Sequence, residues 1–189
     1  MRMLKPAALG LALALSGCID VEMDSAILGP DQARLTGFIE VNRAMFDMMG
    51  GAEEFCPADE GGTLEMRDET ARCNILMEGS FDEVFTENED GSPGPVATDR
   101  GDGTVHVTFP LGDLTGDMEE MRSDPAMAAM FRPMLEGHSI SLSISGVQIV
   151  SSNGTISDDG TRATISFALT DILDDTADIP EDFEAVVRY

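Results

Sequence analysis

The chain has 189 residues, of which 42% are hydrophobic, and this is enough apolar material for one globular domain with a single core. Eleven basic residues stand against 36 acidic ones, a formal net charge of −25. Because nucleic-acid binding depends mainly on Lys and Arg side chains that neutralise phosphates, this charge excludes a nucleic-acid partner. The apolar content argues against full disorder, which combines high charge with few apolar residues.

The start of the chain has the pattern of a bacterial lipoprotein signal. Two basic residues precede the apolar run 7–15, and Leu15-Ser-Gly-Cys18 resembles a lipobox. In lipoproteins with this signal, cleavage falls before the cysteine, whose thiol carries a diacylglyceryl group. We therefore predict residues 1–17 as a signal peptide and Cys18 as the lipidated residue. The alternative is a plain secretory signal with a chance cysteine.

The predicted mature protein, residues 18–189, is expected to be a single domain in the cell envelope, facing the periplasm. The apolar run is too short for a spanning helix, which needs roughly 20 residues, and no later segment qualifies. We expect the acyl anchor alone to hold the protein on a membrane. Ile19, in place of an aspartate, favours the outer over the inner membrane by resemblance to enterobacterial sorting rules. From Cys18 onward there are nine arginines, no lysine and 36 acidic residues, which disfavours docking on anionic head groups.

Two further cysteines, Cys56 and Cys73, lie in a chain that is exported to an oxidising compartment. We predict a disulfide between them, which stabilises the fold by about 3 kcal/mol for a loop of this size. A redox pair normally shows Cys-x-x-Cys, and a metal site needs further Cys or His nearby. Neither pattern occurs here.

Periodicity and turn residues predict an α+β domain, in which a curved, mainly antiparallel sheet packs against a few short helices. The first half of the chain is predicted to begin with a hairpin of two strands, 19–28 and 33–41. A helix over 42–49, capped by Asn42, comes next. A strand over 72–79 and a helix over 80–87 with a capping box follow. Residues 88–102 have loop composition throughout.

The second half begins with a strand over 104–109 that turns His106 outward. A helical period over 113–136 follows, with Asp124 as its cap, Pro133 as a kink or early stop and Gly137 as terminator. Ile140, Leu142 and Ile144 then alternate with serines, and further strands are predicted over 146–150 and 163–169, the latter as the last strand.

Parts of this pattern resemble a known family. Gly146-Val-Gln-Ile-Val150, Ser152-Asn-Gly154 and Asp158-Asp-Gly160 look like the end of the LppM-like lipoprotein domain, and Cys18-Ile-Asp-Val-Glu-Met23 resembles its beginning. The resemblance implies an α+β domain with a curved sheet packed on helices and a role in binding membrane lipids. The sequence departs from the family in lacking a carboxy-terminal transmembrane helix and a basic tail, which puts in doubt any function that needs two membrane attachments.

Methionines recur at helical spacing at Met118 and Met121 and again at Met127, Met130 and Met134. Such flexible, polarizable side chains can repack around acyl chains, although an ordinary core is an alternative, and a thioether copper site is a more remote one. Helix residues three and four apart share one stripe, and strand residues two apart share one face of a sheet. If an apolar ligand binds, we expect it to lie between such a helix stripe and such a sheet face. The predicted lining residues are Met127, Met130, Phe131, Met134, Ile140, Leu142, Ile144, Ile165 and Phe167.

Catalytic and metal motifs are not matched. Gly137-His-Ser-Ile-Ser141 lacks the last glycine of a nucleophile elbow, and His106 and His138 have no zinc-binding spacing. We expect His106 to be solvated and His138 to be a hydrogen-bonded structural residue. Residues 86–97 fail the calcium-loop pattern at both ends, which leaves only a weak alternative site of Asp90, Asp99 and Asp102.

Two functions follow from these observations. The first is a noncatalytic, membrane-anchored envelope lipoprotein that binds a lipid or other apolar ligand between the sheet and the Met-rich helices, with no cofactor and no metal. The second is an envelope lipoprotein that binds another protein and has no ligand cavity. An internal cavity favours the first, and a packed core with an exposed apolar patch favours the second.

Overall fold

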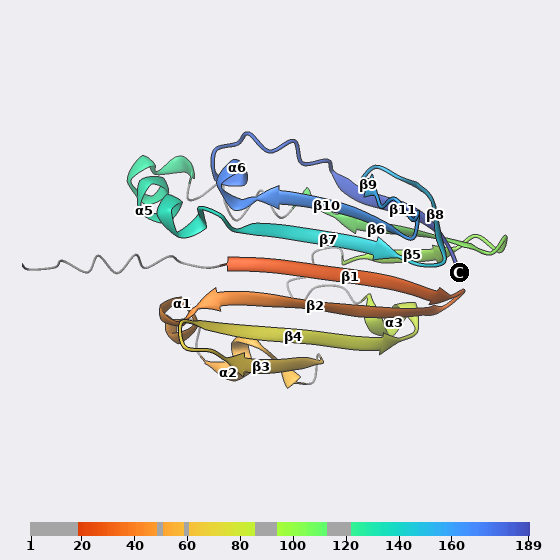
Figure 1. Ribbon diagram of the computed structural model, residues 1–189, viewed down its shortest axis with the longest axis horizontal. Coiled ribbons are helices and arrows are strands. Elements are labelled where there is room, and N and C mark those ends of the chain that lie inside the picture. The colour runs from red at the N-terminus through yellow and green to blue at the C-terminus, as the bar shows by residue number, and fades with distance from the viewer. Residues whose placement is uncertain (1–18, 49–50, 59–60, 86–93, 113–121) are drawn as a thin grey trace, which may run out of the picture.

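The computed structural model describes residues 19–48, 51–58, 61–85, 94–112 and 122–189. Within these ranges the chain forms eleven strands and five short helices, arranged as two open, mostly antiparallel sheets (Figure 1). The predicted combination of a mainly antiparallel sheet with short helices is therefore confirmed, with a second sheet in addition. The curvature of the sheet stays a prediction. The signal peptide and Cys18 lie outside the described residues.

The larger sheet has seven strands, and all neighbouring strands are antiparallel except β1 and β7. Strand β1 is central, because it pairs with β2 on one side and with β7 on the other. In spatial order the strands are β3 (Gly62–Met66), β4 (Thr70–Gly79), β2 (Gln32–Asn42), β1 (Ile19–Gly29), β7 (Ser139–Ser145), β10 (Arg162–Ala168) and β9 (Thr155–Ile156).

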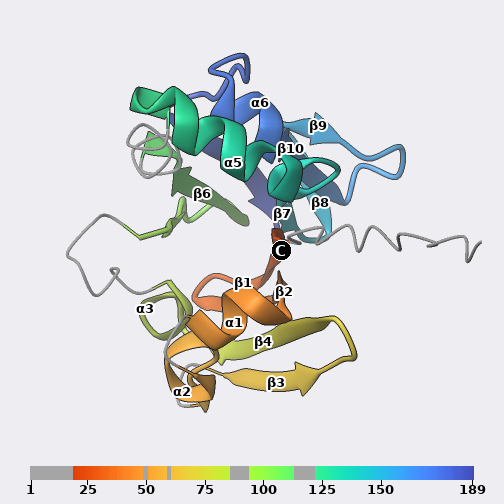
Figure 2. The ribbon, with the colours of Figure 1, turned by 90° about the vertical axis from the view of Figure 1, so that its left-hand side faces the viewer.

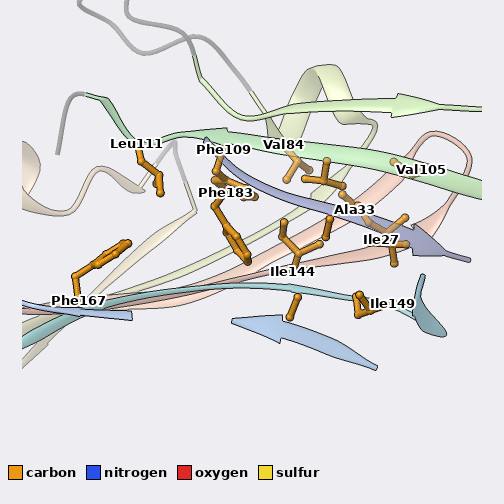
Figure 3. Packing of buried hydrophobic residues seen from close by; sticks show 14 of the residues in the cluster. Ile27, Ala33, Val84, Val105, Phe109, Leu111, Ile144, Ile149, Phe167 and Phe183 are labelled. Carbon is orange, nitrogen blue, oxygen red and sulfur yellow. The ribbon is translucent and has the colours of Figure 1, made fainter. Parts of the chain in front are cut away.

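The smaller sheet has four antiparallel strands and covers one face of the larger sheet. Side chains from both sheets, among them Ile144 and Phe183, occupy the space between them (Figure 3). As predicted, Val105, Val107 and Phe109 point into this core. The order of the strands is β5 (Val96–Asp99), β6 (Thr104–Pro110), β11 (Asp182–Arg188) and β8 (Gln148–Ser152).

The helices begin where the capping residues predict. The Met45 amide donates to Asn42 Oδ1 at 2.6 Å, Ser80 and Glu83 form a reciprocal capping box, and the Asp124 side chain accepts from the amides of the first helical turn. Gly137 has a φ of +86°, as expected for a helix terminator. The helices are α1 (Arg43–Met48), α2 (Ala52–Phe55), α3 (Phe81–Val84), α5 (Pro125–Leu135) and α6 (Leu169–Leu173).

Some predicted boundaries are wrong. The strand predicted over 146–150 is β8, which begins at Gln148, ends at Ser152 and belongs to the smaller sheet. The strand predicted to end at Leu169 ends at Ala168, and the last strand is β11. Helix α3 ends at Val84 rather than near residue 87, and β5 lies within the predicted loop 88–102. Much of the predicted helix 113–136, including Met118 and Met121, lies outside the described residues.

Two separate hydrophobic clusters cover the inner face of the larger sheet, defined here as the face toward the smaller sheet. The main cluster joins β1, β7 and β10 to the smaller sheet and to α3, α5 and α6. The second cluster joins β2 and β4 to α1 and α2, with Phe46 and Phe55 in an edge-to-face contact at 5.5 Å between ring centroids. Figure 2 shows the helices of the second cluster well apart from α5 and α6.

Candidate ligand site and anchor end

The disulfide predicted from the sequence is present in the second cluster. Cys56 and Cys73 are joined, with their Cα atoms 5.4 Å apart, and both are nearly inaccessible. Cys56 caps the end of α2 and Cys73 lies in the middle of β4. The bridge therefore ties the short helix α2 to the sheet.

The structure brings together the sheet half of the predicted ligand lining. Ile165 is opposite Leu142 and Phe167 is opposite Ile140 in the β7–β10 register, so these residues share the inner face with Ile144. Ile144 and Phe167 are buried, whereas Ile140, Leu142 and Ile165 are half-buried against the main cluster.

The helix half of the predicted lining is placed differently. Met127 and Met130 are on the outer side of α5, with 39% and 60% of their surface exposed, while Phe131 and Met134 are half-buried. Leu135 and Ala128 are the α5 residues that pack into the main cluster. The smaller sheet, which the local sequence pattern does not predict, packs with Ile144 and Phe167 in the main cluster. Ligand binding at the nine predicted residues stays a prediction.

Between the two clusters lies an apolar area that we call the central strip, formed by Val21, Met23, Gly37 and Met77. These residues are half-buried, and among the described residues Val21, Met23 and Met77 pack into neither cluster. They lie on the inner face of β1, β2 and β4, where Met23 is opposite Gly37 and Leu35 is opposite Met77. The central strip is thus an apolar part of the sheet that the described core covers only partly.

Gly37 is required by the close approach of Met23. A Cβ atom at position 37 would lie 2.5 Å from Met23 Sδ and 2.1 Å from the Glu22 carbonyl oxygen. The missing side chain therefore allows Met23 to lie across β2. This arrangement puts a flexible thioether side chain in the middle of the central strip.

Ser25 adds a polar group at one end of the central strip. Its side chain is fully buried, and its Oγ has no hydrogen-bond partner among the described residues. Ser25 follows Val21 and Met23 on the same face, because alternate residues of a strand point the same way. A buried hydroxyl without a partner is unusual. Sequence reasoning missed this residue, although a serine in the alternation Val21, Met23, Ser25, Ile27 is the signal for it.

Described residues line several surface depressions. One, of about 380 Å³, lies beside β10 and α6 and includes Ile165 and Phe167, but its remaining lining is mainly polar. Another, of about 310 Å³, is lined by Phe81, Phe85, Val96 and their neighbours. A smaller one, of about 120 Å³, is lined by His106, Ser151, Glu184 and their neighbours.

Both histidines have the environments predicted from the sequence. His138 Nδ1 lies 2.9 Å from Asp20 Oδ2, and the other Asp20 oxygen accepts from the Ser139 amide at 3.1 Å. His138 is therefore a hydrogen-bonded structural residue. His106 lies on β6, 3.8 Å from Glu184, and is partly exposed. Within the described ranges there is no group of three or more His, Cys, Asp or Glu side chains that could hold a metal ion.

The weak calcium site considered above is not assembled by the described residues. Asp99 Oδ1 accepts from the Gly101 amide, and Asp102 Oδ1 accepts from the amide and hydroxyl of Thr104. The Thr104 hydroxyl is the main cause of the lowered pKa of Asp102. These carboxylates stabilise the turn before β6, and Asp90 lies outside the described residues.

A half-buried carboxylate, Asp24, connects three strands on the outer face of the larger sheet. Asp24 accepts from Arg162 at 2.7 Å and from Ser145 at 3.1 Å, which links β1 to β10 and β7. Burial raises the pKa of Asp24 above its usual value, although Arg162 and Ser145 act in the opposite direction. This polar network joins the outer face of the same three strands whose inner face enters the main cluster.

None of the helices in the described part of the chain has both the length and the apolar character that a bilayer-spanning helix needs.

Searches against protein-family models and against curated proteins find no match. The class of protein is instead indicated by its fold, a mixed α/β domain of two open sheets. Among solved structures, the folded domain of LppM from Mycobacterium tuberculosis, determined by NMR, has the same fold. The TM-score is 0.56 at 14% identity, over 98% of this chain and 96% of that one. The similarity to an LppM-like domain expected from the sequence is thus confirmed at the level of the fold.

Proposed function

We propose that this protein is a noncatalytic, membrane-anchored envelope lipoprotein that holds a lipid or other apolar ligand on the central strip. The lipobox supports the anchor, and the LppM-like fold is consistent with the lipid-binding role that the family resemblance implies. Ile19 after Cys18 favours the outer membrane. No cofactor or metal is part of the proposal.

The observation that carries the proposal is the central strip together with Ser25. Val21, Met23 and Met77 offer apolar contact that the described core leaves partly exposed, and the unpaired Ser25 hydroxyl beside them becomes available when a ligand displaces the side chains that cover it. Ligand sites of this kind combine mainly apolar walls with a few polar groups that fix orientation. This location lies on β1, β2 and β4 and replaces α5 as the expected wall of the site.

The test compares lipids that copurify with the exported Cys18→Ser protein and with two further variants of it. Met77→Gln places an amide on the central strip and is expected to reduce the lipid signal in mass spectrometry several-fold. Met66→Gln is the matched control, because Met66 lies on the neighbouring edge strand β3 and is 42% exposed. Absence of lipid from the parent protein, or equal loss in both variants, would contradict the proposal.

The anchor is tested separately. The wild-type protein is expected to incorporate labelled fatty acid and to fractionate with membranes, whereas Cys18→Ser is expected to be released. If the substituted protein still fractionates wholly with membranes and the wild type takes up no label, the anchor assignment is wrong.

A second function, binding to an envelope protein, is favoured by β8. This strand forms one edge of the smaller sheet and carries Val150, which is 51% exposed, while Val147 just before it is 69% exposed. A sheet edge with exposed apolar side chains can accept a strand from a partner. A photo-crosslinking residue at position 150 is expected to capture one defined envelope protein in cells if this function holds, and none if it does not.

A further inference from the structure

Helix α5 has a composition that contrasts with the rest of this acidic protein. Its eleven residues include no acidic side chain, and its one charged residue, Arg132, pairs with Asp174. The exposed residues of α5 are otherwise apolar: Pro125, Ala126, Met127, Ala129, Met130 and Pro133. A surface helix of a soluble domain normally turns charged residues outward, so α5 presents an apolar surface where water-facing polar groups are expected.

This surface lies at the end of the molecule where β1 begins. The His138–Asp20 and Ser139–Asp20 hydrogen bonds hold the segment just after α5 against the second residue of β1. Helix α1 starts two residues after Val41, which pairs with Ile19. Figures 1 and 2 show α1 and α5 on either side of the start of β1.

Helix α1 ends in a further exposed methionine at the same end. Met48 is 76% exposed, compared with 60% for Met130 on α5. The exposed residue before it, Asp47, limits the apolar surface of α1 to its tip. Three exposed methionines, Met48, Met127 and Met130, thus flank the first strand.

If Cys18 carries the proposed acyl anchor, this end of the domain must lie close to the membrane surface. Strand β1 begins at Ile19, the residue directly after Cys18, so no linker separates the lipidated residue from the sheet. One peptide unit spans only about 3.8 Å. The acyl chains of Cys18 therefore bring the start of β1, and with it α1 and α5, to the level of the lipid head groups.

We propose that this end of the domain is a membrane-contact surface, in which Met127 and Met130 of α5 and Met48 of α1 enter the outer part of the bilayer around the anchor. The inference rests on the proposed lipidation of Cys18 and adds an orientation to it. An apolar helix surface whose one cation, Arg132, is already paired with Asp174 suits insertion among acyl chains and zwitterionic lipids, because the strongly negative domain is repelled by anionic ones. The sheet then stands end-on to the membrane.

The experiment uses the absence of tryptophan from the chain. Met130→Trp, Met48→Trp and Val147→Trp each create a single fluorescent reporter in the lipidated full-length mature protein. Val147 is the matched control, since it is 69% exposed and follows Ser145 at the opposite end of the sheet, where Ser145 pairs with Ala26. Because β1 has 11 residues, the two ends lie roughly 30 Å apart.

Each variant is reconstituted in phosphatidylcholine vesicles whose acyl chains carry bromine, a contact quencher of tryptophan. Fluorescence of the Met130→Trp and Met48→Trp variants is expected to fall about twofold or more, whereas that of Val147→Trp stays near its value in unbrominated vesicles. Flotation of the same samples measures anchoring independently.

The possible outcomes separate the two proposals. Protein that floats with the vesicles but shows no quenching at positions 48 and 130 overturns the contact surface and leaves the anchor intact. Protein that does not float overturns the anchor and the inference that rests on it. A concentration-dependent dimer in detergent that Met130→Glu dissociates would assign the surface of α5 to a second copy of the chain, and this also overturns the proposal.

Discussion

Asp20 and His138 are 118 positions apart in sequence, and their side chains meet at 2.9 Å beside the first strand. Both oxygens of Asp20 are used, because the Ser139 amide donates to the second one. The pair therefore fixes the chain between α5 and β7 against the beginning of β1. It holds the segment that follows α5 next to Asp20, two residues after the predicted lipidated cysteine.

We expect Asp20→Ala to lower the free energy of unfolding by about 1 to 2 kcal/mol, because two hydrogen bonds to a carboxylate are lost at a partly exposed site. Glu22→Ala, an exposed position on the same strand, is the control and should change it by less than about 0.5 kcal/mol. Urea unfolding measures both variants. A double-mutant cycle with His138→Ala should give a clear coupling energy, and strict additivity would contradict the pair.

The Cys56–Cys73 bridge should contribute substantially to stability. Replacing both cysteines with alanine is expected to lower the free energy of unfolding by about 3 kcal/mol, because the unfolded chain regains the entropy of an open loop. Thermal unfolding with and without reductant checks this expectation. Thiol titration of the denatured, nonreduced protein should detect no reaction at positions 56 and 73, and two reactive thiols would refute the bridge.

The turn between β9 and β10 should give an acid-dependent contribution to stability. Hydrogen bonds from the Ser157 hydroxyl and from the amide and hydroxyl of Thr161 lower the pKa of Asp159 from 3.8 to about 2. Because the folded pKa lies below the unfolded value, this contribution is fully present above about pH 4 and is lost as the pH falls through about 2.

Comparison of wild type with Asp159→Asn by urea unfolding between pH 2 and 7 tests this. The stability difference should be constant near neutral pH and shrink below about pH 4. Asp158→Asn, which leaves the three hydrogen bonds of Asp159 in place, is the control. A difference that grows toward low pH would contradict the assignment.

Gly146 is a point of close approach between the two sheets. A Cβ atom there would lie 2.3 Å from Val187 Cγ1, and Val187 is fully buried. Gly146→Ala is therefore expected to lower the free energy of unfolding by about 1 to 3 kcal/mol. At Gly29, where the nearest atom would be Gln32 Cβ at 3.7 Å, the same substitution should be tolerated. The urea midpoints of the two variants decide the question, and equal midpoints would argue against tight packing at Gly146.

The features predicted correctly have local causes. The β1–β2 hairpin follows from strict alternation around Gly29 and Pro30, and the capping box follows from Ser80 and Glu83, which are three residues apart. The disulfide follows from the export signal and the number of remaining cysteines. In each case the information lies within a short segment or in the composition.

The errors have a common cause in long-range packing. Leu169 continues the alternation of β10 but starts α6, where Ile172 and Leu173 share its burial. The assignment of β8 to a different sheet from β7 depends on pairing with β11, far along the chain. The central strip depends on which residues the smaller sheet leaves uncovered. These three features depend on tertiary contacts, which the local spacing of hydrophobic residues does not reveal.

The parallel pairing of β1 with β7 has a consequence for how the chain folds. Strands β1, β2, β3 and β4 lie within the first 79 residues and can pair before the rest of the chain is available. The other edge of β1 stays open until residues 139–145 arrive, because only β7 can fill it. Pairing between strands that are distant in sequence is slow, and until it occurs the unpaired backbone groups of the strand edge can bind a wrong strand. The pairing of β7 with β1 is therefore the step at which misassembly is most easily started.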